Sequence, residues 1–179
     1  MNIILFSRNQ LKHRPEQLRT MFAAIEHHGF EYSVNEDFAN IIESLTDIRI
    51  DAQHRYTISP SHSQNSVIVT YGGDGTLLDA LSLRPTPDTP IVGINCGRLG
   101  YLTADNGEGI EELFGRIAEQ KLNFEQRHML KVESSLSDIM PLALNEVTIH
   151  RHGATMISVE ALINGKTIST YHGDGLIVS

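Results

Sequence analysis

Short apolar runs alternate with amphipathic segments along residues 1–122, and this alternation limits the possible folds more than any other feature. The apolar runs are typical of buried strands, and the segments between them have the spacing of helices. Strands are expected at Ile3–Phe6, Glu31–Val34, Val67–Tyr71 and Ile91–Asn95, and helices at 15–29, Phe38–Leu45, Thr76–Leu83 and Gly107–Gln120. This order of elements favours one parallel sheet with helices on both faces.

The pattern changes at Asn123, after which strand-like runs follow one another without helical spacing. Asn164-Gly165 separates two of these runs and is a strong signal for a tight hairpin turn. We therefore expect an α/β domain over residues 1–122 and a β-rich domain over residues 123–179. The predicted strands of the second domain are Met129–Glu133, Ala143–His150, Met156–Ile163, Thr167–Tyr171 and Leu176–Val178.

Charge and composition exclude several classes of function. The formal net charge is −8 and Lys and Arg are not clustered, which argues against nucleic acid as a partner. The first apolar run is too short for a signal peptide or a membrane span, so we expect a cytoplasmic protein with no membrane partner. The single Cys96 fits a reducing compartment. The histidines lack metal-site spacing, so no metal-ligating side chain is predicted.

The stretch Tyr71–Thr76 places a carboxylate among three glycines at the carboxyl end of a predicted parallel strand. Open α/β sheets bind their ligands at this end. Glycines permit positive φ angles and a close approach of ligand to backbone, so Gly73, Gly75 and the helix beginning at Thr76 are candidates for phosphate binding. Two interpretations of Asp74 stay open: it points into the ligand crevice, or it only caps the following helix.

Three later stretches carry further recognisable motifs: Asn95–Leu102, Asn145-Glu146 and Gly173-Asp174-Gly175. The Gly-Gly-Asp-Gly-Thr string at residues 72–76 occurs in several phosphoryl-transfer families. Together, and in this order, the four motifs resemble those of the NAD kinase family. Tyr101 stands where the family usually has phenylalanine in its Asn-x-Gly-x-Leu-Gly-Phe-Leu pattern, which diacylglycerol-type lipid kinases do not share.

The resemblance implies both a fold and an activity. The expected fold is an α/β, Rossmann-like parallel sheet with flanking helices, of the phosphofructokinase/NAD kinase type, followed by part of an all-β sandwich. The implied activity is phosphorylation of NAD to NADP at the adenosine ribose 2′-hydroxyl. The donor is ATP or polyphosphate, the expected cofactor is a divalent cation such as Mg²⁺, and a homo-oligomer is expected. A lipid kinase and a non-catalytic nucleotide-binding fragment remain as alternatives.

The same resemblance assigns roles to individual residues. Asp74 is the expected catalytic base; a carboxylate with a pKa of about 3.9 is a weak base for an alcohol, but a loose phosphoryl-transfer transition state needs the proton removed only late. Tyr101 is expected to close against the ligand. His172, two residues before Asp174, is expected to line the same pocket as Asp174. The expected dinucleotide-binding residues are Gly73, Asp74, Gly75, Thr76, Asn95, Tyr101, Asn145, Glu146, His172 and Asp174.

The end of the sequence also leads to an expectation. The family continues beyond its Gly-Asp-Gly motif into a Thr-Pro-Thr-Gly-Ser-Thr-Ala-Tyr-Ser stretch that contacts the dinucleotide, whereas this sequence ends at Ser179. We therefore expect a truncated β-domain with an unpaired edge strand. A chain with this incomplete pocket is expected to phosphorylate NAD poorly or not at all.

Overall fold

The computed structural model describes residues 1–8, 14–60, 65–96, 100–103, 109–136 and 141–179. The chain divides into two compact units, Met1–Phe124 and Glu125–Ser179.

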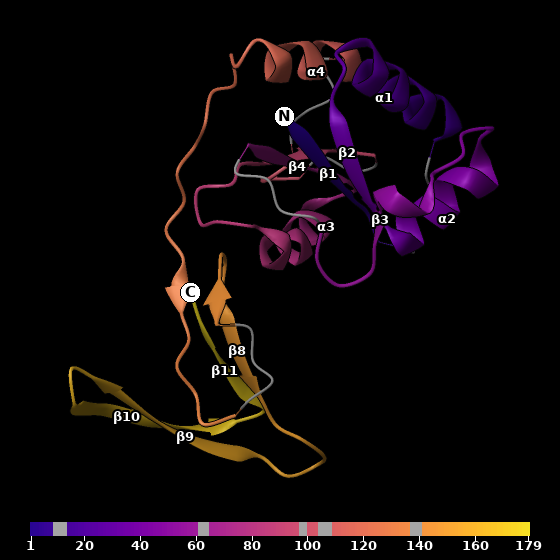
Figure 1. Cartoon of the computed structure of the whole chain (residues 1–179). Helices are drawn as coiled ribbons and strands as arrows, with labels where there is room; N and C mark the ends of the chain where they lie inside the picture. Colours follow the sequence, from indigo (N-terminus) through magenta and orange to yellow (C-terminus); the bar gives the residue numbers. More distant parts are fainter. Residues whose placement is uncertain (9–13, 61–64, 97–99, 104–108, 137–140) are drawn as a thin grey trace. The chain divides into compact units, whose positions relative to one another are not determined.

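The first unit is built on a parallel sheet of five strands in the order β3-β2-β1-β4-β5 (Figure 1). The register pairs Phe6 with Thr70 and Tyr71 with Ile94, so the carboxyl ends of the three neighbouring strands β1, β4 and β5 lie at one edge. The predicted parallel sheet is therefore confirmed. Its strands are β1 (Asn2–Phe6), β2 (Glu31–Asn35), β3 (Arg55–Tyr56), β4 (Ser66–Tyr71) and β5 (Ile91–Ile94).

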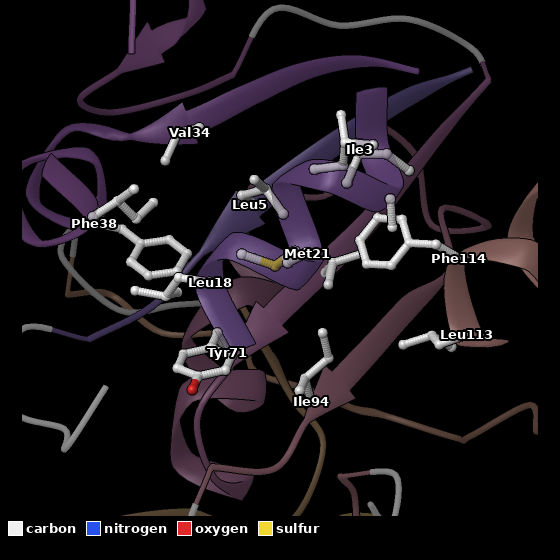
Figure 2. Packing of buried hydrophobic residues seen from close by; sticks show 14 of the residues in the cluster. Ile3, Leu5, Leu18, Met21, Val34, Phe38, Tyr71, Ile94, Leu113 and Phe114 are labelled. Carbon is white, nitrogen blue, oxygen red and sulfur yellow. The ribbon is translucent and has the colours of Figure 1, made fainter. Parts of the chain in front are cut away.

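Helices cover both faces of this sheet. The larger core lies under α1 (Pro15–His27), α2 (Glu36–Leu45) and α4 (Ile110–Ala118), where Leu18, Phe38 and Phe114 pack on one face of the strands (Figure 2). The smaller core lies on the other face, against the 3₁₀ helix η2 (Ala80–Leu83), which follows α3 (Asp74–Asp79). None of the helices in the described parts of the chain has the length and apolar character needed to cross a membrane.

Local signals explain where the helices begin and end. Pro15 occupies the first turn of α1, and Gly29 follows the helix with a φ of 62°, a left-handed conformation that glycine adopts readily. The predicted second helix begins two residues earlier than expected, at Glu36, because the side chain of Asn35 caps it by accepting from Phe38 N at 3.4 Å. Between α2 and β4 the chain also forms η1 (Ala52–His54) and the edge strand β3, neither of which is among the elements expected from the sequence.

Among the described residues of the second unit, the regular secondary structure consists of β-strands in two-stranded antiparallel sheets. Strands β9 (Ile157–Ile163) and β10 (Lys166–Gly173) form an antiparallel hairpin, and its turn residues Asn164 and Gly165 have φ angles of 51° and 77°. These angles explain the Asn-Gly pair. Strand β11 (Gly175–Val178) pairs with β8 (Val147–His150), and β6 (Leu130–Lys131) pairs with β7 (Leu142–Ala143). The single strand predicted at Ala143–His150 is interrupted at residues 144–146.

Candidate active site

The sheet of the first unit has a topological switch point between β1 and β4. The chain leaves β1 through α1 to reach β2 on one side, and it leaves β4 through α3 to reach β5 on the other side. In open α/β sheets the crevice outside the carboxyl ends of two such strands is the usual place for a ligand. The residues at this position are Ser7 and Arg8 after β1, and Gly72–Gly75 after β4.

Asp74 is the first residue of α3, and its carboxylate binds the loop that follows β5. Oδ2 accepts from Tyr101 N at 2.7 Å. Oδ1 accepts from Leu102 N and Thr103 N, both at 3.1 Å, and from the Thr103 hydroxyl at 3.3 Å. The helix N-cap is Gly73, and no side chain bonds to the cap. The interpretation of Asp74 as a helix cap is therefore wrong, because the carboxylate joins two separate segments instead.

The hydrogen bonds lower the pKa of this carboxylate. Partial burial raises the pKa of Asp74, but the bonds from Tyr101, Leu102 and Thr103 outweigh burial and hold the pKa below its usual value. A carboxylate oxygen offers about two lone-pair sites. Oδ1 already accepts three bonds and Oδ2 accepts one, so Oδ2 is the oxygen with room for a ligand hydroxyl.

The glycines at the site do not adopt unusual backbone angles. Gly100 instead leaves space for the side chain of Asp74. Neither Gly73 nor Gly75 has a positive φ, so their backbone angles do not by themselves require glycine. At Gly100, a β-carbon would lie 2.1 Å from Oδ1 of Asp74 and 2.8 Å from Oγ1 of Thr103. A side chain at position 100 would therefore displace the loop from the carboxylate. At Gly73, by contrast, a β-carbon would meet nothing within 4 Å.

Sequence reasoning missed Arg8, which lies beside the glycine-rich turn. Its guanidinium binds both oxygens of Asp79: Nη2 donates to Oδ1 at 2.6 Å, and Nε donates to Oδ2. The buried Ser7 beside it donates from Oγ to the carbonyl oxygen of Tyr71 at 2.6 Å, which joins the ends of β1 and β4. The available signal was a basic residue two positions after the first strand, but only the pairing of β1 with β4 places it beside the glycine-rich turn.

The other predicted residues of the first unit lie near this edge in different environments. Thr76 is buried inside the first turn of α3, where its N–H donates to the carbonyl oxygen of Gly73 at 2.9 Å. Asn95 is also buried and directly follows β5. The side chain of Tyr101 is 99% exposed, although its N–H is bound to Asp74. Residues 97–99 of the second motif lie outside the described residues.

The predicted residues of the second unit lie at opposite ends of one pair of strands. Asn145 and Glu146 are exposed just before β8, while Asp174 precedes β11. In the antiparallel register Gly175 pairs with His150, so Asp174 lies opposite Arg151, five residues along the strand from Glu146 and about 16 Å from it. The second unit by itself therefore does not bring Asp174 and the Asn-Glu pair together.

Asp174 has a partner that sequence reasoning missed. Nε of Arg151 lies 2.7 Å from Oδ1 of Asp174, as an ion pair without hydrogen-bond alignment, and Arg151 N donates to the carbonyl oxygen of Asp174 at 2.8 Å. His172 is exposed in β10, two residues earlier.

Among the described residues, no group of three or more His, Cys, Asp or Glu side chains could hold a metal ion.

Comparisons with known proteins agree with the motifs. The family model described as the ATP-NAD kinase N-terminal domain matches residues 7–122. An NAD kinase of Bacteroides fragilis is 30% identical over 182 residues, covering 100% of this chain and 62% of the relative. One of Flavobacterium psychrophilum is 31% identical over 184 residues, covering 100% and 63%. The chain thus spans less than two thirds of the length of these relatives.

A solved structure resembles the fold. The crystal structure of yeast NADH kinase complexed with NADH superposes with a TM-score of 0.73 and covers 98% of this chain and 56% of the yeast chain. The sequence identity is 20%, so this likeness shows the fold alone.

Proposed function

The chain belongs to the NAD kinase family, and from this premise we propose that the whole protein transfers a phosphoryl group to the adenosine ribose 2′-hydroxyl of NAD, giving NADP. ATP or polyphosphate is the proposed donor. In the transfer, a bond forms between the ribose 2′-oxygen and the terminal phosphorus. The bond from that phosphorus to the bridging oxygen of the donor breaks, and the hydroxyl proton passes to Asp74.

The observation that supports this proposal is the way Asp74 is held. Three backbone amides and a hydroxyl fix its carboxylate beside the switch point and leave an acceptor position on Oδ2. A fixed acceptor can orient the ribose hydroxyl in line with the donor, and positioning supplies much of the catalysis in phosphoryl transfer. The lowered pKa makes Asp74 a weak base, which suits a reaction in which the proton leaves late.

Dinucleotide-binding residues are proposed in each unit by itself. Gly73, Gly75, Thr76, Asn95 and Tyr101 are the candidates from the first unit. In the second unit, Asn145 offers a donor and an acceptor, Glu146 accepts from ribose hydroxyls, and His172 and Asp174 complete the set. Because Asp174 is paired with Arg151, a ligand amide would share this carboxylate with the guanidinium.

The divalent cation is proposed to bind the phosphate oxygens of the donor together with one or two carboxylates, as is usual for Mg²⁺. When bound, such a cation neutralises charge on the phosphates. The resemblance also supports a homo-oligomer that acts in the cytoplasm. Light scattering on the purified protein tests the oligomeric state.

The test is a substrate panel with the protein expressed from its complete open reading frame. NAD, NADH and diacylglycerol are each incubated with ATP or polyphosphate and Mg²⁺, and NADP is measured with an NADP-dependent dehydrogenase. We expect NADP from NAD. Phosphorylation of diacylglycerol without NADP formation would favour the lipid kinase, and binding of ATP without any product would favour the non-catalytic alternative.

A further inference from the structure

Arg8 lies at the switch point with part of its guanidinium unused. It is the second residue after β1, and the turn at Gly72–Gly75 follows the adjacent strand β4. The bond from Ser7 Oγ to the carbonyl oxygen of Tyr71 holds the two strand ends together, and with them the backbone that carries Arg8. Arg8 is therefore fixed to the crevice where a doubly wound sheet takes its ligand.

Asp79 orients the guanidinium without using all of its donors. Nε and Nη2 face the two carboxylate oxygens, and Nη1 makes no hydrogen bond to any described residue. A guanidinium has five N–H groups in a rigid plane, so the Nη1 edge still offers donors. Nη1 lies next to Gly75, because a β-carbon on that residue would be only 2.7 Å from Nη1. The glycine leaves room for a cation beside the turn.

Stability does not explain this arrangement. The Arg8 and Asp79 side chains are 46% and 42% exposed, and exposed ion pairs of this kind contribute little to folding. Two carboxylates, Asp74 and Asp79, stand at the first and last positions of the short helix α3, in a chain of net charge −8. A polyphosphate approaching this edge therefore needs a local cation, and the free edge of Arg8 presents donors suited to phosphate oxygens.

We propose that Arg8 is a substrate-binding residue that contacts the phosphate chain of the phosphoryl donor through Nη1, with Asp79 as the residue that positions it. This rests on the proposed function only for the name of the donor. The shared chemistry is a chain of linked phosphates, which NAD also contains as its diphosphate. The donor is favoured because Asp74 occupies the same turn, so that the terminal phosphate would lie near the carboxylate that orients the hydroxyl.

The test measures binding and turnover separately in the protein expressed from its complete open reading frame. Arg8→Ala, Arg8→Lys and wild type are titrated calorimetrically with ATP alone and with NAD alone. The matched control is Arg19→Ala, since Arg19 on α1 is 43% exposed and is likewise paired, with Glu16 and Asp47. We expect Arg8→Ala to raise the Kd for ATP about tenfold or more, to leave the Kd for NAD unchanged, and to move Tm by no more than about 4 °C.

Arg8→Lys keeps the charge but cannot bind both oxygens of Asp79 and still present a second edge, so its Kd for ATP should lie between those of wild type and Arg8→Ala. The difference between wild type and Arg8→Ala should shrink as salt is added. Arg19→Ala should bind ATP like wild type. If Arg8→Ala does not fold, the comparison of Arg8→Lys with wild type tests the inference: a raised Kd for ATP supports it, and an unchanged Kd overturns it.

Unchanged ATP affinity in both Arg8 variants would overturn the inference. A loss confined to NAD would assign Arg8 to the dinucleotide diphosphate and overturn the donor assignment. The two proposals fail separately: a wild type that binds ATP through Arg8 but makes no NADP contradicts only the proposed function. A wild type that makes NADP while Arg8→Ala binds ATP normally contradicts only the role of Arg8.

Discussion

Replacing Asp74 with asparagine tests the best-defined part of the site. The substitution keeps the size of the side chain but exchanges one carboxylate oxygen for an NH₂ group. Donors approach both oxygens, so an amide nitrogen in either position faces at least one N–H. In the less costly orientation, the amide oxygen of the asparagine accepts the bonds from Leu102 and Thr103. Its NH₂ group then faces Tyr101 N, which in the wild type donates to Oδ2 at 2.7 Å.

The expected magnitude follows from the bonds lost. One charge-assisted bond disappears and leaves an N–H without its acceptor, which costs about 1–3 kcal/mol, and the remaining bonds become neutral and weaker. Each kcal/mol lowers Tm by about 2–4 °C in a protein of 150–250 residues. The fold should therefore survive. Loss of a positioned base lowers turnover by about 10²–10⁴, so kcat should fall far more than stability does.

The assay compares kcat for NADP formation, NAD affinity and Tm in wild type, Asp74→Asn and Thr103→Val. The valine control removes only the 3.3 Å hydroxyl bond and keeps the carboxylate and its three amide bonds. Its turnover should stay close to wild type. Turnover of Asp74→Asn within a factor of two of wild type would refute the role of the carboxylate. An equal loss in Thr103→Val would show that loop order, and not the base, limits the reaction.

Three further predictions test the geometry and the proposed contacts. Gly100→Ala should lower Tm and NADP formation because a β-carbon would lie 2.1 Å from the Asp74 carboxylate, whereas Gly73→Ala, with open space within 4 Å, should leave Tm nearly unchanged. Asn145→Ala and Glu146→Ala should each weaken NAD binding by about 1–3 kcal/mol in calorimetry, and unchanged affinity in both would leave them as exposed residues only. The lowered pKa of Asp74 gives a stability contribution that is fully present above its unfolded value of about 3.9 and is lost as the pH falls through the folded value. Acid titration of unfolding should therefore show a smaller loss in Asp74→Asn than in wild type.

Sequence reasoning was most successful where local chemistry determines structure. Pro15 and Gly29 mark the ends of α1, and Asn164-Gly165 marks the β9–β10 turn, because each signal acts on its own backbone. The alternation of short apolar runs with amphipathic segments also predicted the parallel sheet. The edge strand β3 was missed because Arg55–Tyr56 is only two residues long and carries no apolar period.

The missed site residues depend on contacts between distant segments. Arg8 becomes a candidate only when β1 lies beside β4, and its partner Asp79 is 71 residues away along the chain. The partners of Asp74 are 27 to 29 residues away and are mostly backbone amides, which have no signature in the sequence. Arg151 reaches Asp174 because β8 pairs with β11. The order of strands in a sheet is set by long-range packing, and no local pattern specifies it.

The hydrogen bonds around Asp74 imply a compromise between basicity and position. Bonds that stabilise the charged carboxylate lower its pKa, so each donor makes Asp74 a weaker base. The same bonds fix the loop at 101–103 to α3 and prevent the carboxylate from rotating. In a reaction with a loose transition state the alcohol gains little from early deprotonation, while a misplacement of about 1 Å can cost about a hundredfold in rate. A carboxylate that is held firmly and binds protons weakly is therefore suited to the chemistry proposed for this site.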